Sequence, residues 1–229
     1  MADSASSFPV PPVPGVVPAR ARTVLVVTHP EAAHHVDGVV GGQFDSELTA
    51  EGRDDAERIA AVLAGRVGVE GSRAVISSDL RRTAQTAAVI GDVLGVEPDL
   101  DGRLREKSYG VAGGRAQSWL DERFVPPPAV GDRLRHHEGV DGAETRLEVA
   151  CRVYEAMTDV LARDVDDLVV VTHGYAATFV VAAWIGMPIE AAGHVAFPVC
   201  SGSITTLRED PFFHNRAVTA VGETAHLVG

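Results

Sequence analysis

Short apolar runs alternate with longer stretches of helical periodicity over most of this chain. Residues 23–27 read TVLVV, residues 74–77 read AVIS and residues 168–171 read LVVV. Continuous apolar runs of this kind are typical of strands that are covered on both faces. The intervening helical spacing falls at about 50–63, 80–94, 147–161 and 179–184, and the last two strands are expected at 203–207 and 217–221. Strands that alternate with helices predict an α/β fold, a three-layer α/β/α sandwich with a mostly parallel central sheet.

Two parts of the chain depart from this alternation. Residues 1–21 are rich in proline and alanine, and they predict a disordered N-terminal arm. Residues 105–140, called the 105–140 segment below, follow no regular period apart from a short helix expected around Trp119. We therefore expect a single domain over residues 22–229, with the 105–140 segment inserted into it as a lid.

Charge and hydropathy exclude several classes of partner. The 229 residues hold 20 Lys and Arg against 32 Asp and Glu, a formal net charge of −12. A surface this negative repels phosphate backbones, so nucleic acid is not an expected partner. Residues 168–189 lack charged side chains, but Thr172-His173-Gly174 interrupts them, so they predict a buried strand and helix and no membrane span. We expect a cytoplasmic protein without a membrane partner.

The sequence lacks the motifs of several common kinds of active site. It has neither the GxxxxGK[ST] phosphate loop nor the GxGxxG fingerprint, and it has no GxSxG nucleophile turn. The two cysteines, Cys151 and Cys200, lie far apart and form no metal-binding pair. We expect both to be small buried side chains.

Two of the predicted strands are followed by a histidine. Val26-Val27-Thr28-His29-Pro30 closes the first, and Val170-Val171-Thr172-His173-Gly174 closes the late one. Ligands of parallel α/β sheets bind at the carboxyl ends of the strands, so His29 and His173 are expected to face one site. A neutral imidazole can attack phosphorus while other nitrogen donors hold the phosphoryl oxygens.

Several ordered segments resemble the histidine phosphatase superfamily, also called phosphoglycerate mutase-like. Residues 77–87, SSDLRRTAQTA, are close to its SSDLxRAxQTA motif, which is the most specific match. The weaker matches are Leu48-Thr49-Ala50-Glu51-Gly52, Leu104-Arg105-Glu106 with Tyr109-Gly110, Gly142-Ala143-Glu144-Thr145 and Val171-Thr172-His173-Gly174. The resemblance runs from about Thr23 to the C-terminus, and it implies a phosphoglycerate mutase-like fold.

The same resemblance implies a role for each matched residue. His29 would be the nucleophile that becomes phosphohistidine, and Arg82 and His173 would bind the phosphoryl group. Glu106 would protonate the leaving oxygen and then activate water. The implied enzyme is a metal-independent phosphatase that needs no cofactor and acts on a small phosphorylated metabolite. A homodimer remains open, and the sequence does not identify the substrate.

The first motif departs from the family pattern. Where the family reads Arg-His-Gly, this chain reads Thr28-His29-Pro30, so a permanent charge at the phosphate is replaced by a hydroxyl. His35 stands near a position where the family often carries a phosphate-contacting Asn. We expect Thr28 and His35 to contact phosphate, with a protonated His35 restoring part of the lost charge. Binding and rate would then improve as pocket histidines other than the nucleophile become protonated.

These departures leave alternatives to a fully active phosphatase. One is a weakened or inactive member that binds a phosphorylated or other anionic ligand without turnover, and another is a relative with shifted chemistry. A mutase is less expected because the Arg-His-Gly-Glu-Ser signature common in mutases is not present. A metal cluster of His34, His35 and Asp37 is also less expected, because adjacent residues on a regular element point apart.

Overall fold

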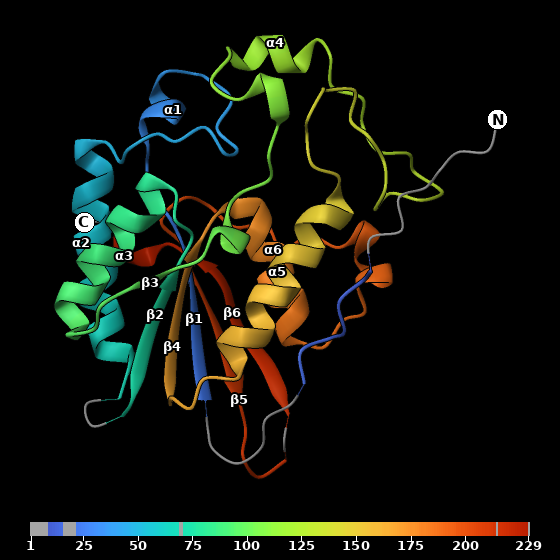
Figure 1. The fold of residues 1–229 in the computed structure, drawn as a ribbon. Coiled ribbons are helices and arrows are strands. Elements are labelled where there is room, and N and C mark those ends of the chain that lie inside the picture. Colours follow the sequence, from blue (N-terminus) through green and yellow to red (C-terminus); the bar gives the residue numbers. More distant parts are fainter. Residues whose placement is uncertain (1–8, 16–21, 69–70, 214, 229) are drawn as a thin grey trace.

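A six-stranded sheet forms the centre of the computed structural model, which describes residues 9–15, 22–68, 71–213 and 215–228 (Figure 1). The strands are β1 (Arg22–Thr28), β2 (Arg73–Ser77), β3 (Asp99–Leu100), β4 (Asp167–Thr172), β5 (Ile204–Glu209) and β6 (Arg216–Glu223). Their order across the sheet is β3-β2-β4-β1-β5-β6. Strands β1 to β4 pair in parallel, whereas β5 is antiparallel to β1 and to β6. The mostly parallel sheet predicted from the sequence is confirmed.

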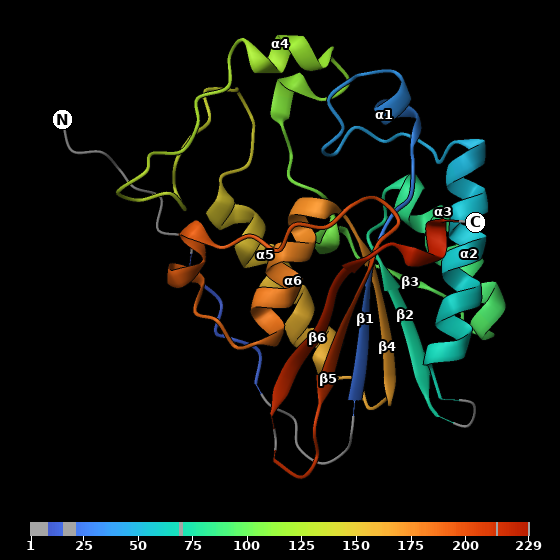
Figure 2. The ribbon, with the colours of Figure 1, turned by 180° about the vertical axis from the view of Figure 1, so that it is seen from behind.

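Two layers of helices cover the sheet, one on each face (Figure 2). Helices α2 (Ala50–Arg66) and α3 (Arg81–Leu94) pack on one face, and α5 (Arg146–Leu161) and α6 (Gly174–Trp184) pack on the other. The short helices α1 (Ala33–Val36) and α4 (Gln117–Asp121) lie beyond the carboxyl ends of the parallel strands. Short 3-10 helices cover Gly102–Leu104, Gly110–Ala112, Ile189–His194 and Ala225–Leu227. This arrangement confirms the three-layer α/β/α sandwich.

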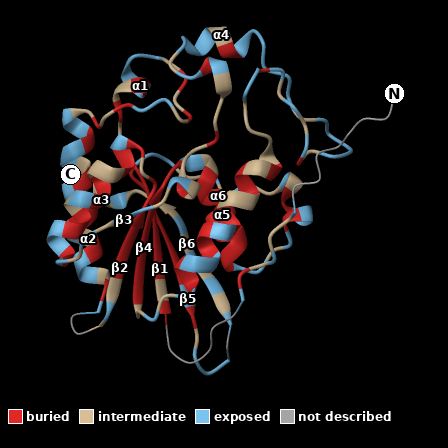
Figure 3. Cartoon of the chain, in the orientation of Figure 1, coloured by how far each residue is buried: buried red, intermediate tan, exposed pale blue. Residues whose placement is uncertain are grey.

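Alternation along the strands divides the core into two halves. Val24 and Val26 of β1 face α5 and α6, and Leu25 and Val27 face α2 and α3. All four side chains are buried, and Figure 3 shows the central strands buried along their length. Burial on both faces explains why these strands read as continuous apolar runs in the sequence.

The described part of the N-terminal arm lies against the domain. Val10 packs against the core cluster beneath α5 and α6, and the carbonyl oxygen of Gly15 accepts a hydrogen bond from Arg216 at 3.2 Å. Residues 9–15 of the arm therefore have contacts with the sheet-and-helix core, and the predicted disorder of residues 1–21 stays a prediction. Residues 1–8 and 16–21 lie outside the described residues.

The 105–140 segment has a small core of its own. Ala112, Leu120 and Val140 pack with Val40, and Trp119 lies against this cluster. The short helix expected around Trp119 is confirmed as α4. In the described part of the chain, no helix is long and apolar enough to cross a membrane. The uncharged stretch at 168–189 is a strand followed by a helix, β4 and α6, as predicted.

Candidate active site

The ends of three strands bring the predicted histidines together. β1 and β4 are parallel neighbours whose last residues, Thr28 and Thr172, are in register. His29 and His173 follow directly, and their ring centroids are 5.1 Å apart in an edge-to-face arrangement. Because β5 is antiparallel to β1, the start of β5 lies at this same edge. The loop before β5 therefore adds Cys200 to the wall of the pocket.

The hydrogen bonds of His29 define which ring nitrogen is available. Nδ1 lies 2.7 Å from the carbonyl oxygen of Pro30, which can only accept, so Nδ1 carries the proton. Nε2 therefore holds the lone pair, and it accepts from Nε of Arg82 at 3.1 Å. Burial, and then the nearby Arg82 charge, hold the pKa of His29 well below its usual range. The ring is thus a neutral base with Nε2 directed to the guanidinium.

Backbone carbonyl oxygens anchor the guanidinium of Arg82. It is 1% exposed, and it donates to the carbonyl oxygens of Gly42 at 2.6 Å and Phe44 at 2.9 Å. Burial lowers its pKa to about 10, so the side chain is still charged at neutral pH. Gly42 has φ of +54°, and a Cβ there would lie 2.7 Å from the carbonyl oxygen of Lys107. Only glycine fits this loop without strain.

His173 leaves one nitrogen unused. Its Nε2 lies 2.9 Å from Oγ of Ser78, whereas Nδ1 is buried and has no hydrogen-bond partner among the described residues. Burial, followed by the neighbouring His29, lowers the pKa of His173 well below its usual range. A buried polar atom without a partner is costly, so this nitrogen is available to a ligand.

The Glu106 carboxylate lies at the first turn of α6. Its oxygens accept the backbone N–H groups of Tyr175 at 3.0 Å, Ala176 at 3.1 Å and Lys107 at 3.0 Å. These donors stabilise the ionised form, but burial outweighs them and raises the pKa of Glu106. The group lines the same pocket as His29 and Arg82. It can therefore hold a proton more readily than an ordinary glutamate.

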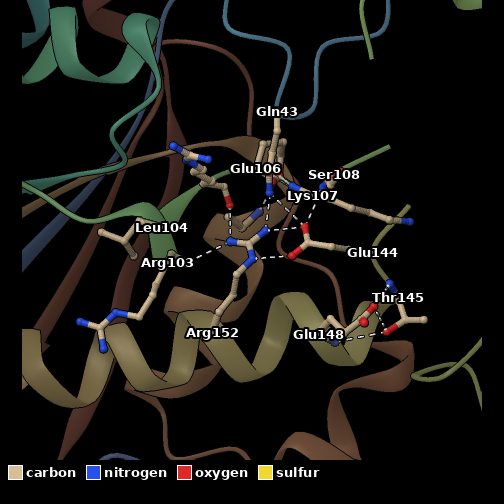
Figure 4. A network of polar contacts seen from close by, with 12 residues as sticks. Gln43, Arg103, Leu104, Glu106, Lys107, Ser108, Glu144, Thr145, Glu148 and Arg152 are labelled. Carbon is tan, nitrogen blue, oxygen red and sulfur yellow. Dashed lines mark hydrogen bonds and ion pairs between the residues drawn. The ribbon is translucent and has the colours of Figure 1, made fainter. Parts of the chain in front are cut away.

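A network of polar contacts fixes the backbone around Glu106 (Figure 4). Arg152 on α5 donates to both oxygens of Glu144, at 2.7 and 2.8 Å, and to the carbonyl oxygen of Glu106 at 2.9 Å. Gln43 also donates to that carbonyl at 3.1 Å, and the N–H of Ser108 donates to Glu144 at 2.7 Å. The same arginine donates to the carbonyl oxygens of Arg103 and Arg105. No local spacing in the sequence marks Arg152 as part of the site.

His34 and His35 also reach this pocket. Their ring centroids are 4.0 Å apart, and the ring of His35 is nearly parallel to that of His29, at 5.7 Å and 14°. The N–H of Ala32 donates to Nδ1 of His35 at 3.2 Å, which leaves the ring proton of a neutral His35 on Nε2. Burial lowers the pKa of His34 to about 3, and desolvation, followed by Arg82, lowers the pKa of His35. The lowered pKa values favour neutral His34 and His35 rings in the free protein, and the expected charge on His35 stays a prediction for the phosphate-bound site.

The neighbouring rings do not form a metal centre. Within the described ranges, no three His, Cys, Asp or Glu side chains are arranged to hold a metal ion. His34 instead bonds Oγ of Ser46 through Nδ1 at 2.6 Å, and Nδ1 of His35 is occupied by backbone. Two ring nitrogens that a metal would need are already in use.

Thr28 is in the wall of the pocket, but its hydroxyl is engaged. It donates to the carbonyl oxygen of Cys200 at 2.5 Å and accepts from the N–H of Ser203 at 3.1 Å. A phosphate held by Thr28 would have to displace the bond to Cys200. Cys200 itself is exposed in the pocket and Cys151 is only partly buried, so the expectation of two buried thiols is wrong.

These groups surround one cavity of about 480 Å³. Its wall combines His29, Arg82 and Glu106 with uncharged residues from the α1 loop, the 105–140 segment and the loop before β5. The lining residues are Thr28, His29, His34, His35, Gly38, Val39, Gly41, Gly42, Arg82, Glu106, Tyr109, Gln117, Gly174, Val199, Cys200 and Ser201. His173 is not among these lining residues, and its ring lies against that of His29. The fold thus brings His29, His35, Arg82, Glu106 and His173 to one place.

Comparison with known proteins identifies one family. Residues 24–218 match the model of the histidine phosphatase superfamily, branch 1. The probable phosphoglycerate mutase GpmB of Yersinia enterocolitica is 31% identical over 211 residues, which cover 89% of this chain and 94% of that protein. GpmB of an Enterobacter species is 32% identical over 207 residues, with the same coverage.

Solved structures show the same fold. A mycobacterial glucosyl-3-phosphoglycerate phosphatase in complex with VO3 superposes with a TM-score of 0.72 at 25% identity, over 89% of this chain and all of that chain. A structure described as mycobacterial hydrolase 1 gives a TM-score of 0.72 at 26% identity, over 90% of this chain and 100% of that one. The similarity therefore extends over nearly the whole described domain.

Proposed function

This chain belongs to the histidine phosphatase superfamily, and we propose that it is a metal-independent phosphomonoesterase that works through a phosphohistidine on His29. One observation carries the proposal. The bond from Nδ1 of His29 to the carbonyl oxygen of Pro30 fixes a neutral tautomer whose Nε2 lone pair lies beside the Arg82 guanidinium. The proposed nucleophilic nitrogen thus lies beside the cation that would bind the phosphoryl group.

In the first step, Nε2 of His29 attacks phosphorus and the bond to the leaving oxygen breaks. Protonated Glu106 gives its proton to that oxygen, which its raised pKa favours. Arg82 neutralises charge on the phosphoryl oxygens, and the unpartnered Nδ1 of His173 is available to one of them. The Pro30 carbonyl stabilises the positive charge that develops on the His29 ring.

In the second step, the ionised Glu106 takes a proton from water. The resulting oxygen attacks phosphorus, the N–P bond breaks, and its electron pair returns to Nε2 of His29. Inorganic phosphate leaves, and Glu106 is again protonated for the next cycle. Neutral His35 can assist by donating from Nε2, so its proposed contact with phosphate needs no charge.

We prefer a phosphatase to a mutase although both activities are named among the relatives. The residues around the nucleophile read Thr28-His29-Pro30-Glu31-Ala32, which differs from the mutase signature at three of five positions. A mutase must also return the phosphoryl group to a bound acceptor before water reaches it. The substrate we propose is a small phosphorylated metabolite.

Hydrolysis of p-nitrophenyl phosphate in EDTA tests this proposal. Wild type should turn over without added metal, and His29→Ala should lower the rate by about 10³-fold or more. His137→Ala is the matched control, because His137 is exposed and does not line the pocket. Acid-labile, alkali-stable phosphate should be trapped on wild type and be absent from His29→Ala. Equal rates in wild type and His29→Ala would contradict the proposal.

A second candidate is a binding protein that holds a phosphorylated ligand without turnover. The engaged hydroxyl of Thr28 favours it, since one family phosphate contact is replaced by a group already bonded to Cys200. This candidate predicts that orthovanadate raises the melting temperature of wild type while a broad panel of phosphate esters is not hydrolysed. Turnover that is lost in His29→Ala would exclude it.

A further inference from the structure

The charges lining the cavity are few. Among the described lining residues, Arg82 is the single permanent cation and Glu106 the single carboxylate. Arg82 is held beside His29 by its bonds to Gly42 and Phe44, so its Nε–H and its unused N–H groups serve the phosphoryl group under transfer. The part of the cavity that holds the rest of a substrate is left without a permanent positive charge.

Histidines do not make up this deficit. The pKa values of the lining histidines are all lowered, that of His34 to about 3, because the rings are desolvated and lie near Arg82. His29 and His35 each have Nδ1 engaged by backbone. At neutral pH these rings therefore form a polar but uncharged wall.

The neighbouring cations point elsewhere. Lys107 is 1% exposed, does not line the cavity, and forms an ion pair with Glu138 between the rings of Tyr109 and Tyr175. Arg152 is held by Glu144. Neither side chain can meet a ligand without abandoning a partly buried carboxylate, which would be costly.

The outer wall is uncharged. It combines small apolar groups with neutral donors, namely Val39, Tyr109, Gln117, Val199, Cys200 and Ser201. Burial raises the pKa of Tyr109, so its hydroxyl remains a neutral donor. Hydroxyl and amide groups of this kind bind alcohol or sugar hydroxyls well and leave a desolvated anion unpaired.

We infer that the substrate is the phosphate monoester of an uncharged alcohol or sugar, whose organic part lies against Tyr109 and Gln117. This inference rests on the proposed function, since it concerns the leaving group of that reaction. An ester with a second anionic group is disfavoured, because the second anion would lose its water while facing Glu106, and the described lining residues offer it no free cation.

Glycerol 3-phosphate and 3-phosphoglycerate form a matched pair, because a hydroxymethyl group in one replaces a carboxylate in the other. Wild type should prefer glycerol 3-phosphate by about tenfold or more in kcat/KM. Gln117→Arg should narrow that ratio several-fold by supplying a cation, and Gln117→Met should not. A wild-type ratio near one, a preference for 3-phosphoglycerate, or a ratio unchanged in Gln117→Arg would overturn the inference.

Hydrolysis of p-nitrophenyl phosphate separates this inference from the proposed function. If wild type hydrolyses none of the three esters, the phosphatase proposal fails. The affinities of the two matched esters, measured by calorimetry, then decide the inference alone. Tighter binding of glycerol 3-phosphate supports the uncharged leaving-group site, and equal or weaker binding overturns it.

Discussion

Nε of Arg82 donates to Nε2 of His29 over 3.1 Å, so in the free protein the arginine holds the lone pair that the proposed reaction uses. A bound phosphoryl group must take this N–H from the histidine before attack can occur. In the proposed mechanism, this N–H therefore occupies the lone pair of His29 when the site is empty and donates to a phosphoryl oxygen when the site is filled.

Replacing Arg82 with lysine should remove this exchange. Lysine cannot make the three hydrogen bonds that the guanidinium donates to His29, Gly42 and Phe44. We therefore expect kcat/KM for p-nitrophenyl phosphate to fall about 10²–10³-fold. Arg81→Lys is the matched control, since Arg81 directly precedes Arg82 on α3 and is exposed. Similar losses in both variants would count against a specific role for Arg82.

The pH dependence should follow the opposite shifts of two groups. His29 must be neutral, and its lowered pKa keeps it neutral well below pH 6.5. Glu106 must be protonated in the first step, and its raised pKa keeps the proton above the usual 4.5. The kcat/KM for phenyl phosphate should therefore be highest in mild acid and decline as pH rises through the pKa of Glu106. A rate that increases toward alkaline pH would contradict these assignments.

The leaving group gives an independent test of Glu106. Phenolate needs a proton more than p-nitrophenolate does, so Glu106→Gln should cost more on phenyl phosphate than on p-nitrophenyl phosphate. Equal losses on the two esters would show that Glu106 does not protonate the leaving oxygen. For wild type and for Glu106→Gln, the rates on the two esters are measured with the same preparation of that enzyme.

Arg152 should act through Glu106 as a positioning residue. Arg152→Lys removes the fork on Glu144 and the bond to the Glu106 carbonyl, and we expect kcat to fall about tenfold with little change in KM. The loss should again be larger on phenyl phosphate, as for Glu106→Gln. Arg163→Lys, in the exposed pair with Asp99, is the control. A loss equal on both esters would indicate a purely structural role.

Acid should destabilise the fold through His34. Its pKa is about 3 in the folded protein against 6.5 for an ordinary histidine, so the folded state takes up fewer protons than the unfolded state between these values. Its contribution is complete above pH 6.5 and is lost as pH falls toward 3, by at most about 1.4 kcal/mol per pH unit. Urea unfolding at several pH values should show a shallower decline for His34→Gln than for wild type. The exposed His137→Gln should retain the wild-type slope.

Most of the fold could be predicted because its strands are buried on both faces. Runs such as 23–27 and 168–171 are apolar throughout, and the histidine after each lies at a strand end by parallel topology. Arg152 could not be found in this way. Its partners are Glu144 and three backbone carbonyls, and only the packing of α5 beneath the 105–140 segment brings them together.

Two local expectations failed for geometric reasons. Adjacent histidines were expected to diverge, but α1 is a single turn, and the rings of His34 and His35 lie 4.0 Å apart on it. Cys200 was expected in the core, but β5 runs antiparallel and its preceding loop reaches the pocket edge. Neither the length of a one-turn helix nor strand direction is encoded in apolar periodicity.

The separate core of the 105–140 segment has an evolutionary consequence. Val40, Ala112, Leu120 and Val140 support Tyr109 and Trp119 without help from the sheet that carries His29 and His173. Mutations in this segment can alter which organic group is accepted while the strand ends stay in place. After gene duplication, single substitutions in this segment would therefore change substrate specificity while the chemistry at the strand ends is kept.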